Sequence, residues 1–213
     1  ILKDLAPFVP ALSRFEEPLD LNLVFSGHGK HLDCPTLRLT NHHGLMIAGE
    51  AALSNWDAGM DMYIYGKLGN LTMTKEGINV LMTNLTGKVP PILQRLDYIR
   101  FNGEAAGYLH DLTLTGLFHT GAGMVKTDVM MSIDEQSMSR TYSGSVASAD
   151  LDLGKLLNQE KKFGKVDFNV ELKGFNYKNR YPESYIKGII SSFEYSQYPV
   201  SYTHLRAHET VLD

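Results

Sequence analysis

The sequence of 213 residues contains one cysteine, Cys34, so it cannot form an internal disulfide, and cysteine usage leaves the redox compartment undecided. It also has no excess of basic residues, because 20 Lys and Arg stand against 24 Asp and Glu. No run dense in Lys and Arg is present, so we expect no nucleic-acid partner. No stretch approaches the ~18 apolar residues of a membrane-spanning helix, and none is predicted.

The sequence also lacks an initial methionine and a signal peptide. We interpret it as an internal segment of a longer protein whose targeting region lies upstream. Residues 1–18 have apolar residues at helical spacing, interrupted by Pro7 and Pro10, which predicts a short helical lead-in. Residues 200–213 break the preceding pattern and resemble the translated sequencing-adapter peptide that ends many metagenomic reading frames. We expect them to make no persistent contact with the rest of the chain.

Alternation of apolar and polar residues is abundant, and it is typical of strands with one buried face. It is clearest over 19–25 and 166–172. An apolar–x–Gly tripeptide closes one such stretch after another, about every 20 residues. Leu85-Thr86-Gly87 is one of its copies. Residues 19–199 are therefore predicted to be mostly β, a curled, mainly antiparallel sheet with short helical inserts at Pro90–Leu96 and Asp150–Lys162.

The recurring glycines favour curvature, because a glycine inside a strand marks a bend or a close backbone approach. A curled sheet can close into a barrel, pack on a second sheet, or stay open as a trough. An open trough leaves a large apolar lining, and such patches usually meet a ligand or a partner. Alternation alone does not choose among the three outcomes.

Three segments together indicate a family. Leu19–Asn55 opens with Leu-x-Leu-x-Phe-Ser-Gly and ends with Ile47-Ala48-Gly49 and Leu53-Ser54-Asn55, and Arg95–Gly103 and Ser148–Leu157 follow it. In this serial order they resemble the AsmA/TamB family of bacterial envelope proteins, most closely the TamB-like (translocation and assembly module) proteins of Bacteroidota. The resemblance covers about residues 1–199.

The resemblance implies a long open trough, or β-taco, that bridges the inner and outer membranes with an apolar interior. It implies phospholipid transport across the periplasm, with a second role in outer-membrane protein assembly. The implied partners are phospholipid acyl chains and outer-membrane β-barrel assembly proteins. Membrane contact would be made only by parts of an inner-membrane-anchored protein that lie outside this segment.

The alternation predicts which side chains line the groove. Sixteen apolar residues make up this predicted lining: Leu19, Leu21, Leu23, Phe25, Leu45, Ile47, Leu53, Met62, Ile64, Phe101, Leu112, Leu114, Val166, Phe168, Val170 and Leu172.

The polar residues form no catalytic or metal-binding pattern. His28 and His31 have no Cys or acidic residue at ligand spacing beside them, and exposed turn histidines explain them better. Ser26 and Ser143 lack the Gly-x-Ser-x-Gly setting of a nucleophile. We therefore expect no catalysis, no metal and no cofactor. Two functions stay open, a lipid-conducting trough and a binding module, either a closed β-sandwich or an adhesin-like repeat, whose apolar face is only core.

Overall fold

The structure, a computed structural model, describes residues 20–134, 136–137, 139–176, 183–196 and 198–209, and the side chains of all of these except 85, 86 and 200–209. The predicted lead-in over 1–18 lies outside the described residues. The elements follow in the order β1 (Asp20–His28), β2 (His31–Thr40), β3 (Leu45–Ser54), η2 (Gly59–Asp61), β4 (Tyr63–Thr74), α2 (Lys75–Thr86), α3 (Pro91–Gln94), β5 (Tyr98–Tyr108), β6 (Asp111–Thr120), β7 (Gly123–Ile133), β8 (Arg140–Ala149), β9 (Leu151–Asp152), α4 (Leu153–Leu157), β10 (Phe163–Asn176), β11 (Glu183–Tyr195) and β12 (Tyr198–Glu209).

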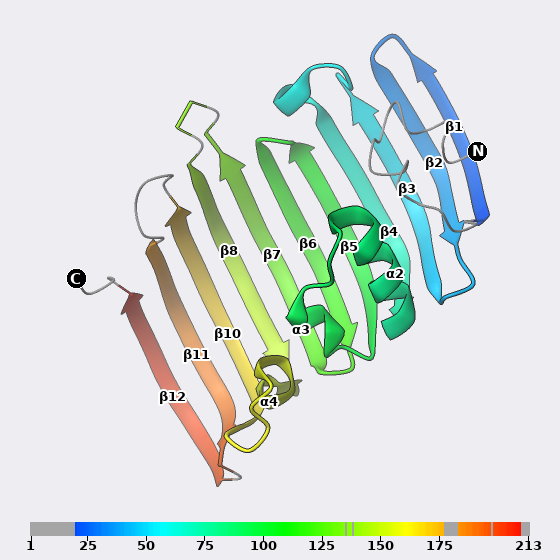
Figure 1. The fold of residues 1–213 in the computed structure, drawn as a ribbon. Coiled ribbons are helices and arrows are strands. Elements are labelled where there is room, and N and C mark those ends of the chain that lie inside the picture. The colour runs from blue at the N-terminus through cyan, green and yellow to red at the C-terminus, as the bar shows by residue number, and fades with distance from the viewer. Residues whose placement is uncertain (1–19, 135, 138, 177–182, 197, 210–213) are drawn as a thin grey trace.

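The strands form one antiparallel sheet in which nearly every strand lies beside the next one in the chain (Figure 1). The order runs from β1 to β8 and then through β10, β11 and β12, while the two-residue β9 pairs with β10 off this path. Antiparallel neighbours can be joined by short turns, so this serial order suits a chain of alternating strands. The mostly β, antiparallel part of the prediction is confirmed.

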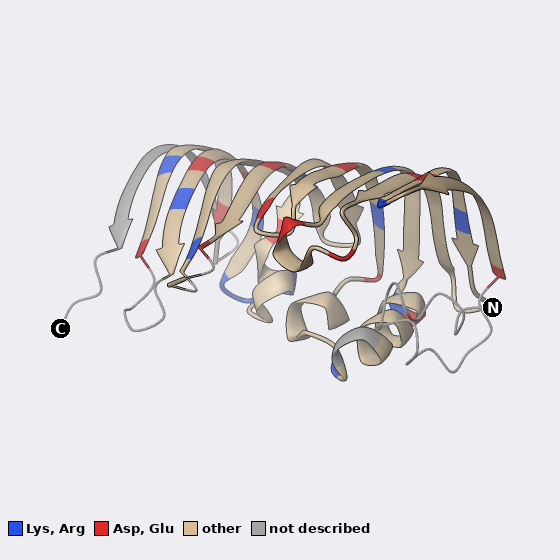
Figure 2. Ribbon diagram, turned by 90° about the horizontal axis from the view of Figure 1, so that it is seen from above, with Lys and Arg blue, Asp and Glu red and all other residues tan. Residues whose placement is uncertain are grey.

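The sheet is open, and it is neither closed nor strongly curled. Among the described residues, β1 and β12 are the two ends of the strand order and do not pair with each other. Its strands bow so that the sheet arches over the helices on one side (Figure 2). A barrel is excluded for the described residues, because a barrel requires paired edge strands.

Helix α2 was not predicted. Thr74 accepts a hydrogen bond from the backbone N–H of Gly77 and caps its first turn, and Gly87 ends it in the left-handed region at φ 76°. Gly87 therefore closes a helix and not a strand, so the interpretation of Leu85-Thr86-Gly87 as the end of a strand is wrong. Glycine is favoured there because it reaches positive φ without a steric penalty.

The two predicted helical inserts are present but shorter. Pro90–Leu96 contains α3, which begins with Pro91 at the first helical position, where proline is tolerated. The segment Asp150–Lys162 forms β9 and only five residues of helix, α4. The cap is Asp152, whose carboxylate accepts from the N–H of Lys155, and Asn158 ends the helix in the left-handed region.

Most glycines of the recurring tripeptide lie inside strands rather than at their ends. Gly49, Gly103 and Gly116 occupy one row across β3, β5 and β6, with Leu68 of β4 between the first two. A Cβ added to Gly116 would lie 2.3 Å from a ring carbon of Phe101, so the backbone and this ring approach too closely for any larger residue. At these three positions the tripeptide marks close approach within the sheet, whereas no atom lies within 4 Å of a Cβ added to Gly66.

The expectation that residues 200–213 make no contact with the sheet is wrong for the part that is described. The backbone of β12 pairs with β11 from Tyr198 opposite Tyr195 to Glu209 opposite Ser184. The interpretation of this segment as an adapter translation stays a prediction, since backbone pairing says nothing about the origin of a sequence.

Candidate functional site

Strand register places apolar residues from distant parts of the chain on one face of the sheet. Directly opposed residues in an antiparallel ladder point to the same side, so a row of opposed residues marks a face. One such row runs from β1 to β10 through Leu23, Leu37, Gly49, Leu68, Gly103, Gly116, Thr127, Val146 and Val170. We call the side to which these residues point the apolar face.

Most of the predicted lining lies on the apolar face. By register and alternation, the members on it are Leu21, Leu23, Phe25, Leu45, Ile47, Leu53, Ile64, Phe101, Leu112, Leu114, Val166, Phe168, Val170 and Leu172. Met62 precedes β4 and lies outside the ladder, and Leu19 lies outside the described residues. Strands β2 and β4 each contain a bulge, an extra residue that shifts the register by one. On both sides of each bulge the apolar residues still point to the apolar face, so the face stays continuous.

The helices cover one rim of the apolar face. Ile78 of α2 packs in a buried cluster with Leu96, Ile99 and Ala122. Partly buried residues from the sheet, the three helices and the segment between α2 and α3 pack against this cluster: Leu71, Met73, Met82, Val89, Leu93, Phe118 and Leu156. Ile99 lies opposite Met73 of β4, so the helices cover the same face that carries the predicted lining.

Burial along the apolar face follows this cover. Leu45, Phe101 and Val166 of the predicted lining are buried, and Phe25 at the β1 edge is 62% exposed. Leu21, Leu23, Ile47, Leu53, Met62, Ile64, Leu112, Leu114, Phe168, Val170 and Leu172 are half-buried. The part of the face away from the helices is therefore lined but not sealed.

The opposite face is richer in charged and polar side chains, although Val24, Met130 and Ile189 are exposed on it. The row beside the glycines carries Glu50, Lys67, Glu104, Thr115 and Asp128 from β3 to β7. The Tyr65 hydroxyl donates to Glu50 over 3.1 Å. Partial burial and this hydrogen bond raise the pKa of Tyr65. The sheet is thus amphipathic, as expected of an antiparallel sheet with one solvated side.

Two open grooves cross the middle of the sheet. One of about 830 Å³ lies over β6–β8, β10 and β11, and its lining includes Leu172, Ile186 and Lys187. The other, of about 720 Å³, lies over β2–β7, with Leu68 and Gly103 in its lining. By register, most side chains that line the two grooves belong to the opposite face, among them Glu171 and Lys173 in the first and Glu50, Lys67 and Glu104 in the second.

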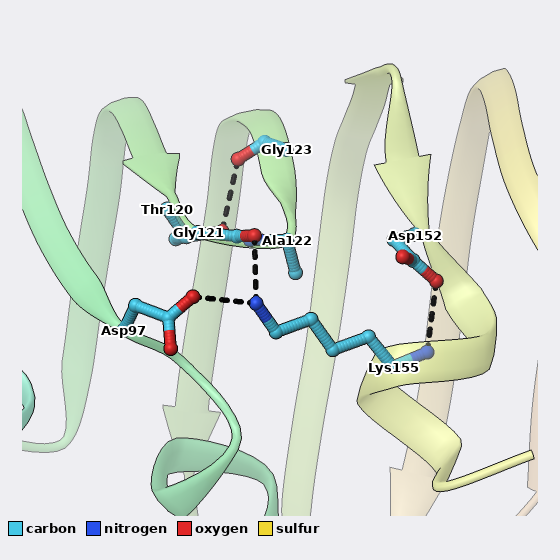
Figure 3. Close-up of polar contacts among 7 residues, drawn as sticks. All are labelled: Asp97, Thr120, Gly121, Ala122, Gly123, Asp152 and Lys155. Carbon is cyan, nitrogen blue, oxygen red and sulfur yellow. Dashed lines mark hydrogen bonds and ion pairs between the residues drawn. The ribbon is translucent and has the colours of Figure 1, made fainter. Parts of the chain in front are cut away.

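A polar clasp holds α4 to the junction between α3 and β5 (Figure 3). The Lys155 ammonium group lies 2.6 Å from the Asp97 carboxylate and donates to the Gly121 carbonyl over 3.0 Å. The guanidinium of Arg95 donates to the carbonyl of Leu156 in the same helix. Contacts with Lys155 lower the pKa of Asp97. The clasp joins segments about 60 residues apart, and no local sequence pattern indicates it.

His28 and His31, the histidines considered in the sequence analysis, belong to no cluster of metal-binding side chains among the described residues. His31 is hydrogen-bonded to Ser54 at 2.7 Å and to Asp33 at 2.9 Å, which fixes the orientation of its ring. Within the part of the chain that the structure describes, no group of three or more His, Cys, Asp or Glu side chains is placed to hold a metal. Among the same residues, no helix is long and apolar enough to cross a membrane.

Comparison with known proteins identifies no relative. The chain matches no family model, no curated protein and no solved structure.

Proposed function

We propose that this chain is an internal segment of a periplasmic, AsmA/TamB-like protein that shields phospholipid acyl chains as they pass between the inner and outer membranes. The observation that carries the proposal is the register, which aligns apolar residues of β1–β8, β10 and β11 on one face that the helices cover only at a rim. Large apolar faces without a cover usually meet a ligand or a partner.

The dimensions of the face suit a lipid tail. A ten-residue strand such as β3 spans ~33 Å at ~3.3 Å per residue. The strand path crosses ten intervals from β1 to β12, or ~48 Å at ~4.8 Å each. Each methylene removed from water contributes about 0.8 kcal/mol, so an acyl chain gains affinity along its whole length. A lining with few polar anchors lets the chain slide across the strands.

The periplasmic location in this proposal comes from the resemblance to the AsmA/TamB family, which is carried by Leu19–Asn55, Arg95–Gly103 and Ser148–Leu157. This resemblance supports a trough fold in the whole protein, phospholipid as the cargo and contact with outer-membrane assembly proteins as a second role. A trough requires a sheet that is more strongly curved than the gentle arch of this segment, and that stronger curvature is part of the proposal.

The alternative is a binding module whose apolar face is core. Such a module needs a second layer over the whole face, as in a β-sandwich. The described residues contain one sheet and three short helices over one rim, so the cover would have to come from another chain or segment.

Charged substitutions distinguish the two sides of the sheet. Ile47→Lys or Val170→Asp places a charge on the apolar face and should block lipid passage in the full-length protein, because an unpaired charge is costly in an apolar environment. The matched control is Asn169→Asp, which changes the exposed neighbour of Val170 on the opposite face. Lipid transfer between vesicles measures the effect. Unchanged transfer in both apolar-face variants would contradict the proposal.

A further inference from the structure

Strand β1 (Asp20–His28) is one edge of the sheet. Among the described residues only β2 pairs with it, so one row of backbone N–H and C=O groups along its nine residues has no strand partner there. Proteins commonly protect such an edge with lysine, proline or a bulge, and β1 contains neither lysine nor proline. The bulge in this pairing lies in β2, where Cys34 and Pro35 together oppose Phe25. Strand β1 itself has no extra residue, and its edge is suited to pairing with another strand.

Apolar side chains are exposed on both faces of this edge. Val24 and Phe25 are each more than half exposed. As neighbours in a strand they point to opposite faces, Phe25 to the apolar face and Val24 to the other. A strand beside β1 would cover both of them, whereas a ligand on the apolar face would cover Phe25 alone. The edge is therefore better matched by a strand than by a molecule that binds one face.

The middle of β1 is complementary to an antiparallel second copy of itself. When Val24 lies opposite Val24 of the second copy, Leu23 opposes Phe25 on the apolar face. On the other face Asn22 opposes Ser26, and their side chains can form a hydrogen bond. Apolar and hydrogen-bonding cross-strand pairs both stabilise antiparallel sheets.

The two ends of β1 single out this register. Asp20 and His28 carry the titratable side chains of the strand, and the register places them opposite each other at both ends of the pair. It also pairs all nine residues of each copy. In the next registers that keep the two apolar faces on the same side, Asp20 loses His28, and Val24 opposes Asn22 or Ser26 instead of a second valine. Charge complementarity and apolar pairing therefore favour the same alignment.

We propose that the edge of β1 binds β1 of a second copy of this chain, antiparallel and with Val24 opposite Val24. Opposed residues point to the same side, so the apolar faces of the two copies join into one continuous face. The interface is isologous, which limits association through this edge to a dimer. The inference goes beyond the proposed function, since the pairing does not depend on what the apolar face binds.

Sedimentation equilibrium of the 213-residue chain measures the association. One strand pair makes a smaller interface than a standard protein complex, so we expect a dimer of twice the 23.8 kDa chain mass with a Kd on the order of 10 μM. Val24→Lys should weaken the dimer about a hundredfold, because it places two lysines opposite each other at the centre of the pair. The matched control is Met130→Lys, at an exposed apolar side chain on the same face within β7, which should leave the Kd unchanged.

A charge exchange tests the register. His28→Asp should weaken the dimer about tenfold, because two carboxylates then face each other at each end of the pair. Adding Asp20→Lys to His28→Asp should restore the wild-type Kd. Within one chain the two positions lie at opposite ends of the strand, ~26 Å apart, so this rescue can come only from contact between copies. Circular dichroism verifies folding, and if Val24→Lys unfolds the chain, the charge exchange carries the test.

A chain that stays monomeric at about 200 μM would overturn the proposal. So would a dimer that Val24→Lys and His28→Asp leave unchanged, since it would form through another surface. A dimer that His28→Asp weakens but that the added Asp20→Lys does not rescue would overturn the proposed register. The measurement contains no lipid, so a failure of the proposed function would not alter its result.

Discussion

The apolar face has a covered part and an open part, although the same alternating pattern builds both. At the covered rim, Ile99 of β5 is 7% exposed, and Ile78 of α2, in the same cluster, is 1% exposed. Towards the edges, Phe25 of β1 and Ile186 of β11 are 62% and 42% exposed. Alternation decides to which side a residue points, and the presence of a helix decides whether that residue becomes core. The buried cluster of Ile78, Leu96, Ile99 and Ala122 forms where the helices lie over the face, and the uncovered edges stay exposed.

The largest expected effect tests the covered part. Ile78→Ala should lower the free energy of unfolding by about 3 kcal/mol, because it leaves a cavity in a fully buried cluster. Leu23→Ala, on the half-buried open part, should cost about 1 kcal/mol. Urea unfolding of both variants measures the two values. Equal costs would show that the open part is as well packed as the covered one.

The next effect concerns the row of Gly49, Gly103 and Gly116 in the sheet. In Gly116→Ala, the new methyl group would lie 2.3 Å from a ring carbon of Phe101 and 2.8 Å from the carbonyl of Asn102. Overpacking of this kind costs about 2 kcal/mol. Gly66→Ala is the control, since no atom lies within 4 Å of its added Cβ, and it should change stability by less than ~0.5 kcal/mol. Thermal unfolding that ranks Gly66→Ala as the worse variant would contradict the packing described for Phe101.

The smallest effect concerns the clasp that ties α4 to the covered part. Lys155 lowers the pKa of Asp97 in the folded state, so the pair stabilises the fold at neutral pH. This contribution is lost as the pH falls below the ordinary value of about 3.9 and through the lowered folded value. The difference in Tm between the wild-type chain and Asp97→Asn should therefore shrink between pH 7 and pH 2. Lys155→Gln should remove the same pH dependence, and a difference that stays constant with pH would exclude the pair as its cause.

The sequence contained enough local information to predict the strands and their apolar side. Period-2 alternation is a property of neighbouring residues, and it survives whatever packs above the sheet. It identified β1 and β10 and the residues that they place on the apolar face. Curvature was predicted more strongly than the structure has it, because glycine spacing indicates where a strand can bend but not by how much.

The cover over the rim could not be predicted in the same way. Helix α2 was missed because Leu85-Thr86-Gly87 fits the recurring tripeptide, although Thr74 as a cap and the spacing of Ile78 and Met82 were available signals. The clasp between Asp97 and Lys155 could not be predicted from the sequence for another reason. Asp97 and Lys155 are 58 residues apart, and only the path of β5–β8 brings them together.

Lipid capture at individual positions tests the central claim most directly. Photo-crosslinking residues at Leu21, Ile47 and Phe168 on the apolar face should capture phospholipid in the full-length protein. The same residues at Asn22 and Asn169, exposed neighbours on the opposite face, should capture none. Equal labelling of both sets, or labelling of neither, would contradict the account and favour an apolar face that serves only as core.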